Sequence, residues 1–263
     1  MVIDFHTHAF PDALAPRAIG RLSEASGGLI PYTDGSVSGL RARMAESGVS
    51  RSVMLSIATN AHQQRAVNDF AISVNGREGI FAFGSVFPDA PDAMEELERI
   101  AAAGLRGVKL HPDYQGFFSD DARYYPLYHK ISDLGLITVF HAGVDYGFAP
   151  PYRNTPERMA RAAKEFSSPV VAAHWGGVDC YEGVLTHLCG GDVYFDTSFG
   201  YSMLPKYYAL QILERHGTER MLFGTDSPWH TAEMEWRLLD TLGLTQTERE
   251  AIAYGNAARL LGL

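Results

Sequence analysis

The chain has 263 residues, and 22 Lys and Arg residues against 31 Asp and Glu give a formal net charge of −9. Phosphate binding needs a basic face. The net charge is negative and no long block of basic or acidic residues occurs, which argues against nucleic acid as a partner. Apolar residues make up 46% of the chain and charged residues 20%, which argues against disorder and indicates a globular protein with a substantial core.

No feature of the sequence indicates a membrane or an export route. No apolar run reaches the roughly eighteen residues that a membrane span requires, and no basic segment precedes an apolar one at the N-terminus. The two cysteines, Cys180 and Cys189, are too few to indicate a disulfide-stabilised secreted protein. We therefore expect a cytoplasmic protein with reduced thiols and no membrane partner.

Short apolar runs, rich in β-branched residues, recur along the whole chain and predict eight strands. They cover residues 1–5, 52–57, 79–83, 105–110, 136–140, 169–173, 192–196 and 220–224. Segments with helical periodicity lie between them, such as the one that Thr155 and Pro156 begin as N-cap and first residue. Thr245 and Glu248 form the pattern of a capping box for a last helical segment.

Strands that alternate with helices predict a parallel sheet, because parallel neighbours need crossover connections. Eight such units favour a closed (β/α)₈ TIM barrel over an open doubly wound sheet. No linker or low-complexity tract interrupts the pattern, so we expect residues 1–263 to form a single α/β domain. The connections at 9–35 and 143–155 are longer than packing needs, and in a barrel both lie at the C-terminal face, where active sites are built.

Several of the ten histidines fall at strand ends. His6 and His8 follow the first strand, and residues two apart in extended chain point to the same side, so both imidazoles can converge on one ion. Such a pair can equally cap a loop or form hydrogen bonds in a core. Its companions favour a metal site, because His141 and His174 end the fifth and sixth strands and Asp226 follows the eighth.

Together these segments resemble the amidohydrolase superfamily, and more narrowly the amidohydrolase-2 branch that contains aminocarboxymuconate-semialdehyde decarboxylase and metal-dependent hydrolases. The matching segments are residues 3–8 (IDFHTH), 107–112 (GVKLHP), 141–143 (HAG), 174–177 (HWGG), 224–228 (GTDSP) and 254–261 (YGNAARLL). The resemblance implies a (β/α)₈ barrel with one divalent ion, usually zinc, held by His6, His8, His141 and Asp226. Three imidazoles and one carboxylate also suit zinc on chemical grounds.

A water bound to such an ion has its pKa lowered towards about 7 and supplies hydroxide at neutral pH. Asp226 would then accept the proton of the water and deliver it to the leaving group. His174 would orient the nucleophile or the developing oxyanion, and the alternatives for His174 are a structural role or ligation of a second ion.

Lys109 and His111 lie on one face of the fourth strand. In binuclear members of the superfamily, a carboxylated lysine on this strand bridges two ions. The Lys-Leu-His-Pro sequence found here resembles the mononuclear branch instead, in which the lysine positions the substrate or lines the barrel. We expect His111 either to line the pocket or to bond within the following loop, and the number of ions stays open.

The candidate substrate wall includes Arg17, Arg153, Trp175 and Trp229. An arginine at the mouth can bind a carboxylate through two hydrogen bonds, which would suit a small acidic substrate. Each arginine could equally be an ordinary surface residue, and each tryptophan could cover core. His230 could reach the pocket, whereas the histidines expected at ordinary helix positions are His62, His129, His187 and His216.

The sequence therefore predicts a metal-dependent hydrolase of a small, carboxylated ester, lactone or amide. The alternative is non-oxidative decarboxylation of an aromatic or unsaturated acid at the same site. A phosphoesterase is a third hypothesis, since such enzymes can also open with Asp-x-His-x-His. A barrel that keeps its metal only to bind a ligand is the non-enzymatic hypothesis. The resemblance is compatible with a homodimer and does not identify the substrate.

Overall fold

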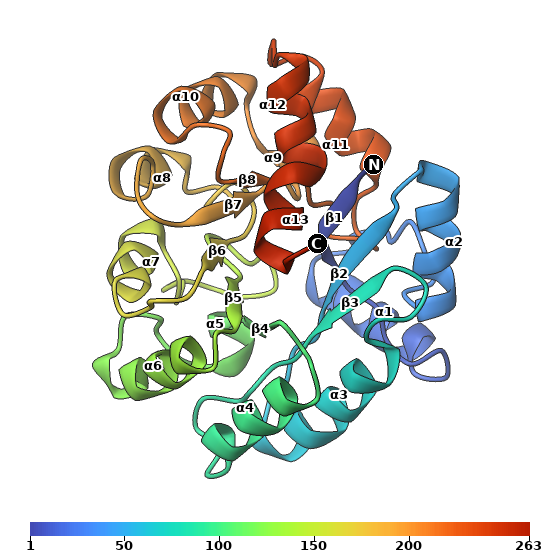
Figure 1. Ribbon diagram of the computed structural model, residues 1–263, viewed down its shortest axis with the longest axis vertical. Coiled ribbons are helices and arrows are strands. Elements are labelled where there is room, and N and C mark those ends of the chain that lie inside the picture. The colour runs from blue at the N-terminus through green and yellow to red at the C-terminus, as the bar shows by residue number, and fades with distance from the viewer.

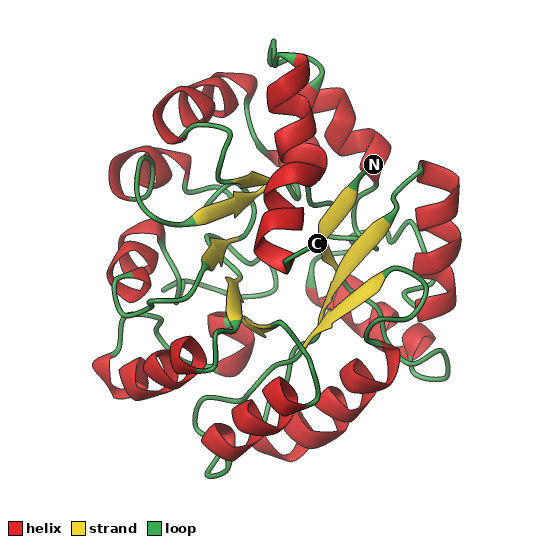
Figure 2. Ribbon diagram, in the orientation of Figure 1, coloured by secondary structure: helices red, strands yellow, loops and turns green.

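The computed structural model describes residues 1–263 and shows strands and helices in alternation, with most of the helices around the outside of the strands (Figures 1 and 2). All eight predicted strands are present and pair in parallel. The strands are β1 Ile3–Thr7, β2 Arg51–Leu55, β3 Ile80–Phe83, β4 Gly107–Leu110, β5 Ile137–Phe140, β6 Val170–Ala172, β7 Tyr194–Asp196 and β8 Met221–Leu222.

Several helices begin at a residue whose side chain accepts a hydrogen bond from the first turn. Thr155 accepts a hydrogen bond from the backbone N–H of Arg158, and Thr245 forms the predicted capping box with Glu248. The helices are α1 Ala15–Ala25, α2 Val37–Ser47, α3 Ala61–Val74, α4 Ala93–Ala102, α5 Pro112–Gln115, α6 Tyr125–Asp133, α7 Pro156–Ala163, α8 Tyr181–His187, α9 Gly200–Met203, α10 Lys206–His216, α11 Ala232–Leu239, α12 Gln246–Glu250 and α13 Asn256–Leu261, with a 3₁₀ turn at Ala122–Tyr124 and a π turn at Ala251–Gly255. None of them combines the length and the apolar composition needed to cross a bilayer.

The strands follow one another around a ring. Strands β1 to β3 and β4 to β8 pair in sequence order. Backbone hydrogen bonds join the two groups at both seams: the N–H of Lys109 donates to the carbonyl of Gly84 at 2.8 Å, and the N–H of Phe5 donates to that of Phe223 at 2.7 Å. This arrangement is the predicted TIM barrel.

Apolar side chains fill the interior of the ring. The cluster comprises Ile3, Phe5, Val53, Leu55, Phe83, Ile137, Val139, Val171 and Leu222 from the strands and Ala257, Ala258 and Leu261 from α13. The last helix therefore packs against the interior, across the ring in the view of Figure 1. A second, larger core lies between the strands and the outer helices and includes Leu97, Ile100, Met159 and Ile212.

Gly107 opens β4 where two strands and a buried ring crowd together. A Cβ at this position would lie 2.5 Å from the carbonyl oxygen of Ile137 and would overlap the fully buried ring of Phe83. We expect Gly107→Ala to lower the free energy of unfolding by about 3 kcal/mol. Gly20→Ala in α1 is the control: nothing lies within 4 Å of its Cβ, so it should raise that free energy by up to about 1 kcal/mol. Urea unfolding measures both, and equal stabilities would contradict the argument.

Candidate active site

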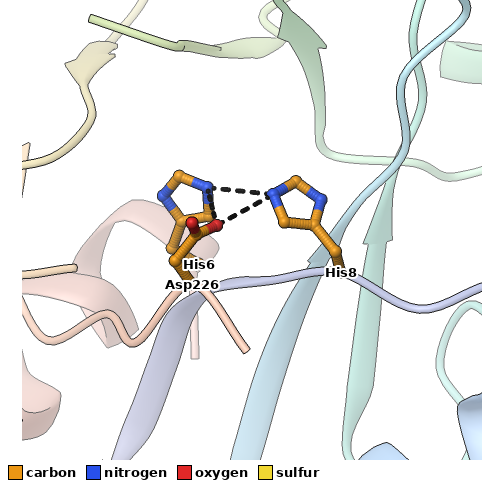
Figure 3. A group of neighbouring side chains, drawn as sticks. All are labelled: His6, His8 and Asp226. Carbon is orange, nitrogen blue, oxygen red and sulfur yellow. Dashed lines mark hydrogen bonds and ion pairs between the residues drawn. The ribbon is translucent and has the colours of Figure 1, made fainter. Parts of the chain in front are cut away.

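Three of the four predicted metal ligands meet where β1 and β8 end. His6 Nε2 lies 3.2 Å from His8 Nε2, and Asp226 Oδ1 lies 3.2 Å from the first and 3.1 Å from the second (Figure 3). The convergence of His6 and His8 agrees with their spacing of two residues in β1. The backbone of Asp226 has a φ of +65°, an unusual conformation for a residue other than glycine.

In both His6 and His8, the ring nitrogen that is not near Asp226, Nδ1, donates a hydrogen bond to an oxygen acceptor. His8 Nδ1–H donates to the carbonyl of Leu55 at 2.8 Å, and His6 Nδ1–H donates to Asp196 Oδ2 at 2.8 Å. Carbonyl and carboxylate oxygens only accept, so both rings carry their proton on Nδ1 and present the Nε2 lone pair to Asp226. Two lone pairs and a carboxylate oxygen thus face one another without a hydrogen between them. A divalent cation stabilises such a group, and the residues present fit one.

The charges around this group also favour a cation. Burial and Lys109 lower the pKa of His6, but the carboxylates of Asp196 and Asp226 outweigh them and raise it above its ordinary value. Burial raises the pKa of Asp226, yet His6 and His8 hold it well below its usual range. Burial lowers the pKa of His8. An anionic Asp226 beside an unprotonated His8 is the state that binds metal.

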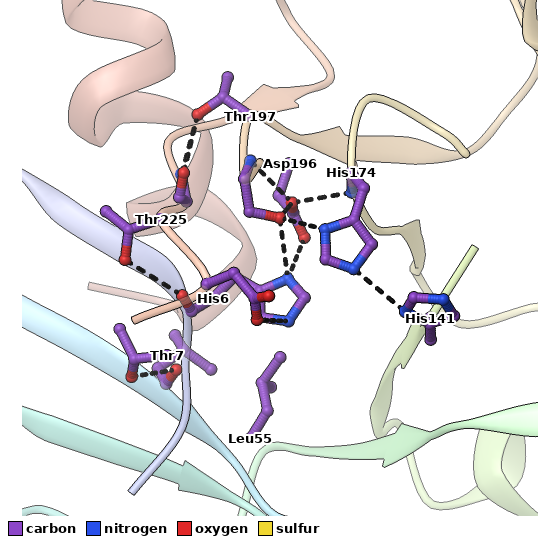
Figure 4. A network of polar contacts seen from close by, with 12 residues as sticks. His6, Thr7, Leu55, His141, His174, Asp196, Thr197 and Thr225 are labelled. Carbon is purple, nitrogen blue, oxygen red and sulfur yellow. Dashed lines mark hydrogen bonds and ion pairs between the residues drawn. The ribbon is translucent and has the colours of Figure 1, made fainter. Parts of the chain in front are cut away.

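A chain of hydrogen bonds leads from Asp196 to His141 (Figure 4). The Ser198 hydroxyl donates to Asp196 Oδ1 and accepts from His174 Nδ1–H at 2.7 Å. The free His174 Nε2 then accepts from His141 Nδ1–H at 3.1 Å. His141 Nε2 is therefore left unprotonated, and it is buried without a hydrogen-bond partner. An orphaned, buried lone pair in the lining of the cavity that the three converging groups also line is a further feature that a cation would satisfy.

His141 does not join the converging group directly. The structure brings it together with His111 and Asp145 instead, and its ring stacks on that of His111 at 4.1 Å. His111 accepts from the N–H of Tyr114 on Nδ1, so its Nε2–H donates to Asp145 Oδ2 at 3.2 Å. Burial holds the pKa values of His111 and His141 well below the ordinary value, and it lowers that of His174 to about 3. These three rings are neutral at pH 7.

Lys109 is the cationic group of the site. Its Nζ lies 3.4 Å from His6 Nε2, and only 1% of the residue is exposed. Burial lowers its pKa to about 8, although Asp196 and Asp226 act in the opposite direction. An ammonium with this pKa can pair with an anion and can also give up its proton.

A cavity of about 140 Å³ adjoins these groups. His111, which we expected either here or in the following loop, lines it together with Lys109 and Trp229. Its other apolar and aromatic lining residues are Phe10, Ile19, Leu22, Leu29, Ile57, Tyr114, Val144, Tyr146, Val178, Phe199 and Pro228. Lys109 is the only lysine in the lining, and no arginine belongs to it.

Arg17, Arg153 and Trp175 lie outside this cavity, contrary to prediction. Arg17 is exposed on α1, about 200° around the helix from the cavity-lining Ile19. Arg153 lies 3.5 Å from Asp113 and close to the ring of Phe118. Trp175 is 1% exposed and donates its indole N–H to the carbonyl of Thr197 at 2.9 Å, so it belongs to the core.

Sequence reasoning missed four residues that shape the site. Asp196 and Ser198 hold the histidines, Asp145 pairs with His111, and Phe199 lines the cavity. Asp196 ends the seventh predicted strand, so the position that singled out His141 and His174 could have singled it out as well. Asp145 lies in the long connection at 143–155, which we expected at the mouth.

The remaining histidines are distributed between surface and core. His62, His129 and His187 are exposed on helices, as predicted. His230 does not reach the cavity, since its nitrogens bond to Glu235 and Ser202. His216 is buried: its ring stacks on Phe195 at 4.0 Å, and its Nδ1 accepts from the N–H of Gly190.

Burial and, to a smaller extent, Arg220 lower the pKa of His216 to about 4. The unfolded chain therefore binds more protons between pH 6.5 and 4, so stability falls as the pH falls through this window. We expect the protonation of His216 in the unfolded chain to lower the free energy of unfolding by about 2 kcal/mol when the pH falls from 7 to 5. His216→Phe keeps the stack, and its unfolding free energy should fall less over the same interval. Identical pH dependences in urea unfolding would contradict this expectation.

Comparison with known proteins agrees with this architecture. The family model described as Amidohydrolase matches residues 3–263. The chain belongs to the amidohydrolase family. The family is metal-dependent, and this member carries groups of residues that could hold an ion. No curated protein sequence matches the chain significantly.

Solved structures with the same fold cover almost the whole chain of this amidohydrolase. A TIM-barrel protein from Bordetella bronchiseptica is 23% identical, with a TM-score of 0.79 over 99% of this chain and 98% of the other. A dihydroxybenzoic acid decarboxylase from Polaromonas, with bound manganese and 2-nitroresorcinol, is 16% identical, with a TM-score of 0.75 over 100% and 97%. A Pseudomonas putida protein named as a 2-pyrone-4,6-dicarboxylic acid hydrolase is 18% identical, with a TM-score of 0.68 over 99% and 97%. At these identities the likeness establishes the fold.

Proposed function

We propose that this amidohydrolase is a metal-dependent, non-oxidative decarboxylase of small carboxylic acids that contain a single ring. The cavity beside the converging histidines carries the proposal. It measures about 140 Å³ and has a mostly apolar and aromatic wall. An apolar cavity of about 150 Å³ holds one benzene molecule, so one ring fits this space.

The charges of the lining support a substrate with one carboxylate. Lys109 is the only lysine or arginine of the lining, and its Nζ lies 3.4 Å from His6 Nε2. Lys109 and the divalent ion can both partner the carboxylate that leaves, and a second carboxylate would need a further cation, which an arginine usually supplies. The sequence-based expectation of an arginine that binds the substrate is therefore not part of this proposal.

We propose that the ion is zinc and that His6, His8, Asp226 and His141 hold it. Manganese is the alternative, because the Polaromonas decarboxylase binds it. When bound, the ion supplies Lewis acidity that polarises an oxygen of the substrate. Asp196 and Leu55 hold the His6 and His8 rings with Nε2 towards the ion.

Decarboxylation breaks one carbon–carbon bond, releases CO₂ and adds one proton to the carbon that is left. We assign the transfer of this proton to Asp226, which lines the cavity and rests as an anion: it takes one proton from a solvent water and passes it to that carbon, which returns Asp226 to its anionic form. His174 lines the same cavity as a neutral ring and contacts the substrate there. Lys109 pairs with the carboxylate before it leaves.

The relatives support this choice. Two similar structures are decarboxylases of 2,6-dihydroxybenzoate, a single-ring acid with one carboxylate, and a third is a decarboxylase of 5-carboxyvanillate, a single-ring acid with two. The Pseudomonas protein supports a second candidate, hydrolysis of a lactone. An uncharged lactone or ester would also suit a wall without arginine. A phosphoesterase is disfavoured, since the lining offers a phosphate dianion no arginine and only Lys109 besides the ion.

A substrate panel tests the proposal. Zinc-loaded and manganese-loaded protein would be incubated with hydroxybenzoic acids and, separately, with uncharged lactones, while CO₂ and released acid are both measured. We expect CO₂ from at least one single-ring acid and no hydrolysis. Acid release from a lactone without CO₂ from any acid would favour the hydrolase instead. Protein that binds no divalent ion would contradict both candidates.

A further inference from the structure

Phe199 forms part of the cavity wall in a strained conformation. It follows β7, and its φ of +61° lies in the left-handed region, which bulky side chains rarely occupy. His174 and Asp226 share this property, with φ values of +59° and +65°. Glycine would adopt this backbone conformation more easily than phenylalanine. Contacts of the phenylalanine ring must therefore offset the strain.

A network centred on the buried side chains of His230 and Glu235 fixes the position of this ring. His230 stacks on Phe199 with 4.3 Å between ring centroids and 19° between planes. His230 Nδ1 lies 2.6 Å from Glu235 Oε1, and its Nε2 lies 2.7 Å from the hydroxyl of Ser202. The second oxygen of Glu235 accepts from the N–H of Tyr201 at 3.1 Å. The carboxylate thus connects α11 to α9, directly behind the ring that lines the cavity.

The order of Ser202, His230 and Glu235 resembles that of a serine hydrolase triad, but the surroundings do not support that chemistry. Neither Ser202 nor Glu235 lines the substrate cavity, so the hydroxyl does not face the proposed substrate. On the cavity side, the edge of Phe199 contacts the ring of His174 at a centroid distance of 5.8 Å. The network of Ser202, His230 and Glu235 therefore reaches the substrate cavity only by way of the Phe199 ring.

We propose that Phe199 determines specificity by limiting the cavity to one ring, and that His230 is the positioning residue whose stacked ring holds it. The inference rests on the proposed function only in that it takes this cavity as the substrate site. Removal of the Phe199 ring would join its volume to the cavity and admit a second fused ring. Loss of the His230 ring would leave Phe199 without its stacking partner and would loosen the same wall.

The test compares phenol with 2-naphthol, two uncharged ring probes that differ by one fused ring. Their affinities for zinc-loaded protein would be measured by NMR titration in the wild type and in the variants Phe199→Gly, His230→Ala and His230→Phe. We expect the wild type to bind phenol at least tenfold more tightly than 2-naphthol. Phe199→Gly should change this ratio at least thirtyfold in favour of 2-naphthol. His230→Ala should change it in the same direction, whereas His230→Phe keeps an aromatic stack and should stay within threefold of the wild type.

Thermal unfolding provides the folding control, and we expect Phe199→Gly to stay folded because glycine suits a φ of +61°. An unchanged phenol to 2-naphthol ratio in Phe199→Gly, or a wild type that binds neither probe, would overturn the role of Phe199. A His230→Phe variant that behaves like His230→Ala would overturn the positioning role of the stack. If the probes behave as expected while no carboxylic acid loses CO₂, the proposed function fails and the assignment of Phe199 stands.

Discussion

Asp226→Asn should abolish turnover and release the bound ion. The asparagine side chain has the same shape but lacks the negative charge that faces His6 Nε2 and His8 Nε2 at 3.2 Å and 3.1 Å. It also cannot exchange a proton with the substrate. Loss of general acid catalysis alone lowers rates by about 10²- to 10⁴-fold, and loss of the ion adds to it. We therefore expect kcat/KM to fall at least about 10⁴-fold.

The measurement combines elemental analysis after dialysis with kinetics on the best substrate of the panel. Arg17→Ala is the matched control, because Arg17 is exposed and does not line the cavity. Its metal content and kcat/KM should stay within twofold of the wild type. An Asp226→Asn protein that keeps one equivalent of ion and normal turnover would contradict the assignment of Asp226.

The sequence predicted the barrel and the location of the site because both depend on local patterns. Apolar runs separated by helical periods identify strands, and the C-terminal ends of parallel strands meet at one face. His6, His8 and Asp226 could thus be placed together although 218 residues or more separate the histidines from the aspartate. Their ring orientations could not be predicted, since these depend on Asp196 and Leu55, which are distant in sequence.

The substrate wall was predicted less well, because it depends on which side of an element faces inward. Arg17 lies in a connection whose helix α1 we did not predict, so nothing indicated that Ile19 and not Arg17 faces the cavity. Arg153 finds a partner 40 residues away in Asp113. Trp175 directly follows His174, yet it packs into the core. In each case the sequence did not indicate which way the side chain points.

Asp196→Asn should weaken metal binding about 100-fold without removing any residue that faces the ion directly. Asp196 accepts hydrogen bonds from His6 Nδ1–H, from the N–H groups of His174 and Ser198, and from the Ser198 hydroxyl. It thereby sets the tautomer of His6 directly and that of His141 through Ser198 and His174. Burial raises the pKa of Asp196, but His6 holds it well below its ordinary range, so the group stays an acceptor. An asparagine amide offers one acceptor oxygen and one NH₂ donor group in place of two acceptor oxygens. It therefore cannot accept from His6 through one oxygen and from the Ser198 hydroxyl through another.

Ser198→Ala separates the two branches, because it interrupts the path to His141 and leaves the bond between Asp196 and His6. We expect it to weaken zinc binding about tenfold, measured by competition with a chelator. The double variant should bind zinc no more weakly than Asp196→Asn alone, since both changes interrupt the same path to His141. Excess zinc should restore much of the activity of Ser198→Ala, which a misfolded protein would not allow. Strictly additive losses in the double variant would show that Ser198 acts independently of Asp196, and the chain from Asp196 to His141 would then be wrong.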